Sequence, residues 1–200
     1  MPSFHSLTLL RGCAVVQLTS ADGTNRLGRA CLAELIDAVE AQRAEAARSA
    51  IRALILTGNS EFFSAGADLN EIARLTGPSA FEFARLGQRL MQSVDDFPVP
   101  AIAAVRGYCM GGALDLALAC DFRLPAPSAI FGHRGASLGV MTGWGGTQRL
   151  PRLIGKARAL EMFITASMVS SSQALAMGLV DAVVEDPVEE ALRRIEAKQD

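Results

Sequence analysis

One carboxylate lies in a segment where carboxylates are rare. Asp115 follows Gly111 and Gly112 in the string GGALDLALAC, whose other residues are almost all apolar. A short helix over 112–120 would place Asp115 one turn after Gly112, among alanine and leucine side chains. An ionised carboxylate is costly there, so the position favours a general acid or base. The alternative is a structural aspartate that accepts hydrogen bonds from first-turn amides or pairs with an arginine.

Two glycine-rich segments could supply backbone donors beside that carboxylate. They read SAGAD over 64–68 and GYCMGGALD over 107–115, and each is expected after a buried strand. Small side chains let backbone N–H groups approach a ligand, and two converging amides stabilise an oxyanion such as a thioester oxygen with enolate character. The N-terminus of the helix at 112–120 adds its dipole. The alternative is that these glycines only permit tight turns and close helix packing.

A third pattern resembles the nucleophile turn of serine hydrolases but has the wrong chain order. Gly135, Ser137 and Gly139 fit G-x-S-x-G. In that fold the histidine follows the serine, whereas both His5 and His133 precede Ser137. A hydrolase is therefore a distant alternative.

The elements that must position these residues alternate between strands and helices. Short runs rich in leucine, valine and threonine predict strands, and apolar residues every three or four positions predict helices. Buried strands reached through helices are typical of a parallel sheet, so the fold class is α/β. Strands are expected at 6–11, 13–20, 51–57, 101–105 and 179–184, with two further apolar pieces at 122–124 and 129–131, and helices at 27–48, 78–96, 112–120, 147–153, 156–165, 172–177 and 187–198.

Turn-forming residues predict the connections between these elements. The segment 59–70 is expected to be a loop and 107–112 a turn, because both are dense in small residues. Ser79 and Glu82 have capping-box spacing near the start of the second helix. Gly178 is placed to end the helix at 172–177.

Composition limits the classes of partner and site. The 200 residues carry 19 basic and 21 acidic side chains, a net charge of −2, which offers no basic face for nucleic acid. Half of the residues are hydrophobic, but no apolar run reaches the roughly 20 residues that span a bilayer, and the first ten residues do not read as a signal peptide. Four cysteines without C-x-x-C spacing and two histidines favour buried reduced thiols, a cytoplasmic location and no metal site.

Several separated strings together resemble the enoyl-CoA hydratase/isomerase family, also called the crotonase family. They are FFSAGADLNE (62–71), VPAIAAVRGYCMGGALDLALACDFRLPA (99–126), FGHRGASLGVMTGWGGTQRLPRLIGKARALEMFITA (131–166) and SSSQALAMGLVDAVV (170–184). The resemblance implies a crotonase-like spiral of β-β-α repeats over 1–200, one acyl-CoA-binding domain with a shortened C-terminal helical part. It also implies a homotrimer or hexamer that uses a coenzyme A thioester as substrate and needs no other cofactor.

The resemblance also assigns roles to particular positions. The amides of Ala67 and Gly112 would hold the thioester oxygen, with Gly111 beside them. Ala65, Ala67, Asp68 and Leu69 would border the adenine of coenzyme A.

The catalytic carboxylates of the family are only half present. Hydratases of this family use two glutamates, and the first corresponds to Asp115. The second corresponds to Gly135, in FGHRG, and the position used by diene isomerases corresponds to Gly143. His133 lies beside the missing carboxylate and is a possible auxiliary base, although the family assigns it no role.

The sequence therefore predicts an acyl-CoA enzyme with one acid–base group. Double-bond isomerisation, or another enolate reaction that moves one proton, is favoured over hydration because Gly135 replaces the second carboxylate. The alternative is a non-catalytic acyl-CoA-binding or scaffold member of the family.

Overall fold

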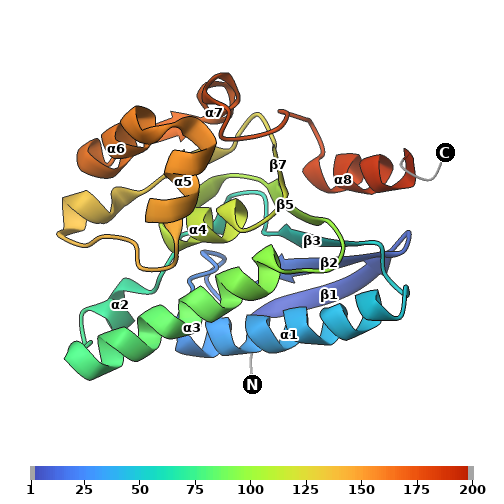
Figure 1. Cartoon of the computed structure of the whole chain (residues 1–200), viewed down its shortest axis with the longest axis horizontal. Helices are drawn as coiled ribbons and strands as arrows, with labels where there is room; N and C mark the ends of the chain where they lie inside the picture. The colour runs from blue at the N-terminus through green and yellow to red at the C-terminus, as the bar shows by residue number, and fades with distance from the viewer. Residues whose placement is uncertain (1–2, 198–200) are drawn as a thin grey trace.

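A computed structural model describes residues 3–197 and contains two sheets (Figure 1). The larger sheet has five strands in the order β1-β2-β3-β5-β7, and all neighbours are parallel except β1 and β2. Its central strands are buried on both faces, as the continuous apolar runs in the sequence predict. The five strands are β1 (His5–Leu10), β2 (Cys13–Leu18), β3 (Ala53–Thr57), β5 (Ala101–Val105) and β7 (Phe122–Pro125).

The smaller sheet has four strands in the order β4-β6-β8-β9. They are β4 (Phe62–Ser64), β6 (Tyr108–Met110), β8 (Ile130–Gly132) and β9 (Met168–Ser170). Successive strands alternate between the sheets: β3, β5 and β7 lie in the larger one, and β4, β6 and β8 follow them in the smaller one. Because helical segments follow each of these strand pairs, the predicted spiral of β-β-α repeats is confirmed.

Helices cover both faces of the larger sheet. On one face α1 (Arg29–Ala47) and α3 (Gly77–Asp95) lie side by side, and on the other lies α8 (Pro187–Glu196) (Figure 1). The apolar stripe of α1 is buried in the main core, as its spacing predicts. The remaining helices are α2 (Leu69–Ile72), α4 (Gly112–Leu118), the 3₁₀ helix η1 (Arg134–Leu138), α5 (Gly146–Ile154), α6 (Lys156–Thr165) and α7 (Ser171–Met177).

Some expectations for the strands are wrong. The segment 179–184 is not a strand, although Asp181 and Val184 donate backbone hydrogen bonds to carbonyls of β7. The expected loop at 59–70 contains β4, and the expected turn at 107–112 contains β6. These three-residue strands are too short to leave a pattern of their own, and they form because they pair with each other.

The helix ends are partly as predicted. The capping box of α3 joins Thr76 and Ser79 instead of Ser79 and Glu82, because Thr76, three residues before Ser79, is the N-cap of the helix. Gly178 ends α7 in the left-handed conformation, as predicted. The last helix was expected to reach Lys198, which lies outside the described residues.

Candidate functional site

A cavity of about 610 Å³ brings together most of the residues singled out in the sequence. It lies between the segment from Ala65 to Leu75, helix α3, the start of α4 and the segment from His133 to Trp144. Its walls are mainly apolar, as in most small-molecule sites. The predicted residues among those that line it are Ala65, Ala67, Leu69, Gly111, Gly112, His133, Gly135 and Gly143.

Two backbone amides in the cavity wall have no acceptor. Within residues 3–197, neither the N–H of Ala67 nor that of Gly112 donates a hydrogen bond. The two loops that carry these amides are in close contact. A Cβ atom added to Gly66 would overlap the carbonyl oxygen of Met110 and lie 3.3 Å from the nitrogen of Gly112. Gly66 and Gly111 both have positive φ, which turns each loop at this contact. The arrangement presents two free donors to one cavity.

A buried asparagine holds the loop that carries Ala67. The side-chain amide of Asn25 donates to the carbonyls of Phe62 and Phe63, at 3.1 and 3.2 Å. The hydroxyl of Ser64 donates to the carbonyl of Asn25 at 2.6 Å and accepts from the N–H of Gly66 at 3.0 Å. Nothing in the local sequence signals this role for Asn25, because its partners lie nearly forty residues away.

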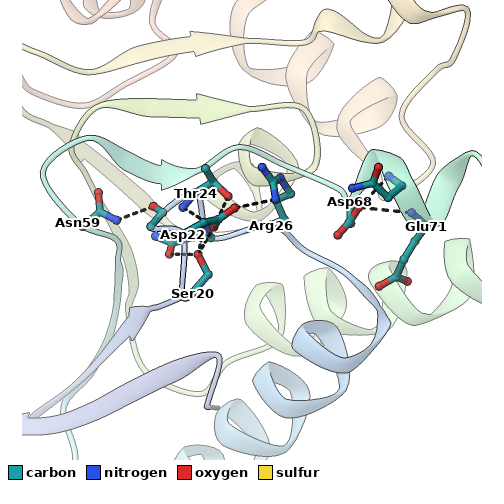
Figure 2. Close-up of polar contacts among 10 residues, drawn as sticks. Ser20, Asp22, Thr24, Arg26, Asn59, Asp68 and Glu71 are labelled. Carbon is teal, nitrogen blue, oxygen red and sulfur yellow. Dashed lines mark hydrogen bonds and ion pairs between the residues drawn. The ribbon is translucent and has the colours of Figure 1, made fainter. Parts of the chain in front are cut away.

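Asp22 organises the turn before Asn25, as Figure 2 shows. It accepts hydrogen bonds from the hydroxyl and the N–H of Thr24 and from the hydroxyl of Ser20, and it pairs with Arg26 at 2.8 Å. These bonds, the one from the Thr24 hydroxyl foremost, lower the pKa of Asp22 to about 2. The carbonyl of Thr24 in turn accepts from the N–H of Ala65, which ties the turn to the cavity wall.

Of the residues that follow Ala67, one lines the cavity and two bind backbone N–H groups at the starts of helices. Asp68 begins α2 by accepting from the N–H groups of Asn70 and Glu71 (Figure 2), and it is absent from the described cavity wall. Leu69 is half exposed and lines the cavity. The carboxylate of Glu71 accepts from the N–H of Arg29 at the start of α1, a contact that the sequence did not predict.

Asp115 is completely buried behind the cavity wall. One carboxylate oxygen accepts a hydrogen bond from the hydroxyl of Thr142. The other, Oδ1, lies 3.1 Å from Nε2 of His133, yet neither atom makes a hydrogen bond with the described residues. His133 lines the cavity, whereas Asp115 is not among its described lining residues. The side chains of Thr142 and His133 therefore lie next to the Asp115 carboxylate, and both residues line the cavity.

Gly146 allows this buried pair to exist. A Cβ atom there would overlap Oδ1 of Asp115 and lie 2.9 Å from Nε2 of His133. On its other side His133 packs against Phe163, with ring centroids 5.1 Å apart. The sequence identified Asp115 and His133 separately, but nothing in it predicted that they would be neighbours, or that Thr142 would join them.

Ser137 and the cysteines have structural surroundings. Ser137 lines the cavity, but it lies inside η1 and its hydroxyl donates to the carbonyl of Arg134. All four cysteines are free and buried, and burial raises the pKa of Cys31 and of Cys120 to about 12. Among residues 3–197 no group of three or more histidine, cysteine, aspartate or glutamate side chains could hold a metal ion. None of the helices in that range could cross a membrane.

Comparison with known proteins identifies relatives of this chain. Residues 9–198 match the family described as enoyl-CoA hydratase/isomerase. A crotonyl-CoA hydratase from Syntrophomonas wolfei is 39% identical over 173 residues, which are 86% of this chain and 65% of the relative. A probable enoyl-CoA hydratase from Bacillus subtilis is 42% identical over 140 residues, which are 70% of this chain and 54% of the relative.

The fold agrees with this relationship. The crystal structure of an enoyl-CoA hydratase from Bacillus anthracis has a TM-score of 0.91 and 36% identity, over 98% of this chain and 76% of the other. The chain thus spans between about half and two thirds of the length of the two curated relatives. The match to the family covers nearly all of the sequence, and the chain belongs to the enoyl-CoA hydratase/isomerase family.

Proposed function

We propose that this protein is an acyl-CoA enzyme that stabilises a thioester enolate at the amides of Ala67 and Gly112. The observation that carries the proposal is that the N–H groups of Ala67 and Gly112 line one cavity and have no acceptor among the described residues. Donors fixed in advance at a site of developing negative charge lower the barrier to enolate formation, because they need not reorganise during the reaction. We retain the homotrimeric or hexameric assembly and the cytoplasmic location implied by the family resemblance as parts of this proposal.

Asp115 is the acid–base group of the proposed reaction. The base breaks a C–H bond next to the thioester or at the end of its conjugated system, and the electron pair passes to the thioester oxygen as an enolate. The same proton is then returned to a different carbon, which moves the double bond. His133 is the auxiliary group: it lines the cavity and Asp115 does not, so the proton passes between the substrate carbon and the Asp115 carboxylate through the His133 ring, whose Nε2 atom lies 3.1 Å from Oδ1. One proton-carrying unit is sufficient for this isomerisation.

Hydration needs a second group that this site lacks. A water molecule must be positioned and deprotonated on one carbon while a proton is delivered to the other, and losing one of two acid–base groups typically lowers the rate by about 10²–10⁴. The position of the second carboxylate is Gly135. Isomerase-like chemistry is therefore favoured over hydration.

Substituting glutamate for Gly135 is expected not to restore hydration. A Cβ atom at Gly135 would overlap the carbonyl oxygen of Val140, and the N–H of Val140 donates to the carbonyl of Gly135 at 3.0 Å. The overlap involves backbone, so Gly135→Glu should destabilise the protein by about 1–3 kcal/mol and distort the cavity wall. Urea unfolding and a hydration assay with crotonyl-CoA test this. Gly135→Ala should lose similar stability, and a tenfold gain in hydration by Gly135→Glu would contradict the prediction.

A non-catalytic acyl-CoA-binding or scaffold role is the alternative. Gly135 favours it, and so does the burial of Asp115 behind Thr142 and His133. Calorimetry with saturated acyl-CoAs, combined with absorbance assays on a panel of 2-enoyl and 3-enoyl-CoAs, separates the two. We expect binding together with formation of the conjugated 2-enoyl product from 3-enoyl-CoA. Binding without any spectral change would support the scaffold, and absence of binding would contradict both.

A further inference from the structure

Two cavities meet at one tryptophan. The first is the 610 Å³ cavity of the proposed acyl-CoA site, and the second has about 740 Å³ and lies between α3 and α5. Both are lined by Thr142, Gly143 and Trp144. The walls differ in character beyond these shared residues. The wall of the second cavity is mixed, with the polar side chains of Gln88, Gln92, Asp95, Arg149 and Arg152 beside Leu118 and Leu153, whereas the wall of the first is mainly apolar.

The indole of Trp144 is fixed between two helices that provide glycines for it. A Cβ atom on Gly87 of α3 or on Gly112 of α4 would overlap the ring. Phe83 packs edge-on against it, with ring centroids 5.3 Å apart. The side chain is only 5% exposed, although its residue lines both cavities. The ring therefore fills the space between α3 and α4 next to the Gly112 amide.

We infer that Trp144 closes the acyl end of the site and restricts the substrate to short acyl groups. The inference rests on the proposed function, which puts the thioester oxygen at Ala67 and Gly112. An acyl chain leaving that point meets the indole that touches Gly112, and the apolar wall ends there. Beyond the ring Leu118 and Leu153 lie among amide, carboxylate and guanidinium groups, which would lose solvation if a long hydrocarbon chain lay against them.

Gly87 and Gly112 make this barrier depend on a single side chain. Removing the indole leaves space beside two residues that have no side chain to fill it. Trp144→Leu and Trp144→Ala should therefore lengthen the apolar chamber in two steps. The leucine variant keeps an apolar side chain against Phe83, so it can be used for the test if the alanine variant folds poorly.

The test compares chain-length preference in binding and in turnover. Dissociation constants for saturated acyl-CoAs, and kcat/KM for enoyl-CoAs, are measured with chains of four, six, eight and ten carbons. In the Trp144 variants the ratio of the ten-carbon to the four-carbon kcat/KM should rise about tenfold or more, and the corresponding ratio of dissociation constants should fall by a similar factor, because one methylene in an apolar pocket is worth about 10-fold or more. Phe97→Leu is the matched control, since Phe97 is a buried aromatic residue absent from both described cavity walls.

An independent measurement tests the packing itself. Gly87→Ala should lower the Tm of the wild type, because its methyl group overlaps the indole, and should lower it much less in the Trp144→Leu background. Unchanged chain-length ratios in both Trp144 variants, with a wild type that binds acyl-CoAs, would overturn the role of Trp144 alone. A wild type that binds no acyl-CoA of any length would instead overturn the proposed function.

Discussion

Replacing Asp115 by asparagine is expected to lower kcat for isomerisation by about 10²–10⁴-fold. The variant keeps the shape of the side chain and its acceptor for the Thr142 hydroxyl, but the amide cannot accept the substrate proton. The dissociation constant of a saturated acyl-CoA should change little, because Asp115 is absent from the described cavity wall. Single-turnover kinetics with a 3-enoyl-CoA, together with calorimetry, separate the chemical step from binding.

The same experiment tests whether Asp115 and His133 act as one unit. If the proton passes between Nε2 of His133 and Oδ1 of Asp115, then His133→Gln should also slow the reaction, and the double variant should be little slower than the worse single variant. Multiplicative losses would mean that the two side chains act separately. Undiminished turnover by Asp115→Asn would remove Asp115 from the mechanism.

Folding must be controlled, because Asp115 is completely buried. Thr142→Val removes the hydrogen bond to the carboxylate while keeping a similar shape. If Asp115 were only structural, both variants would lose stability and neither would lose the chemical step specifically. Comparing Tm with the single-turnover rate for the two variants therefore separates a catalytic carboxylate from a structural one.

The elements with a long local pattern could be predicted from the sequence. The spacing of apolar residues predicted α1, which buries one face against the sheet, and the apolar run from Ile51 to Thr57 predicted β3, which is buried on both faces. The segment Leu179–Val184 has the same apolar character, but it makes only two backbone hydrogen bonds to β7 in the described structure and is not a strand. The outcome there depends on tertiary pairing, which local composition does not encode.

The site was predictable where it depends on backbone and glycine, and less so where distant side chains meet. Two glycine-rich strings pointed to the segments, the family resemblance singled out the amides of Ala67 and Gly112 within them, and both residues line the cavity. Thr142 is 27 residues from Asp115, and its contact exists only because the segment before α5 folds over α4. The carboxylate of Asp68 begins α2, a role that the sequence also allows for an aspartate before a helix, and the place of its loop beside the adenine stays a prediction.

Substituting alanine for Gly66 should separate the two free amides and lower kcat by about 10²–10³-fold. Gly66 has φ of 91°, and its added methyl group would overlap the carbonyl oxygen of Met110 in the neighbouring loop. Relief of that overlap moves the Ala67 loop away from Gly112. Since donors act only at a defined position of the oxyanion, even a small displacement removes much of their effect.

Strain at Gly66 must be distinguished from loss of the amide pair, and Gly178→Ala provides the comparison. Gly178 has φ of 80°, close to that of Gly66, but a Cβ atom there meets no atom within 4 Å, and it ends α7 outside the described cavity wall. In urea unfolding both variants should lose about 1 kcal/mol from the left-handed backbone, and Gly66→Ala should lose more because its methyl group also overlaps Met110. Only Gly66→Ala should also slow the single turnover of a 3-enoyl-CoA. If the two variants kept equal rates, the amides of Ala67 and Gly112 would not be the groups that stabilise the enolate.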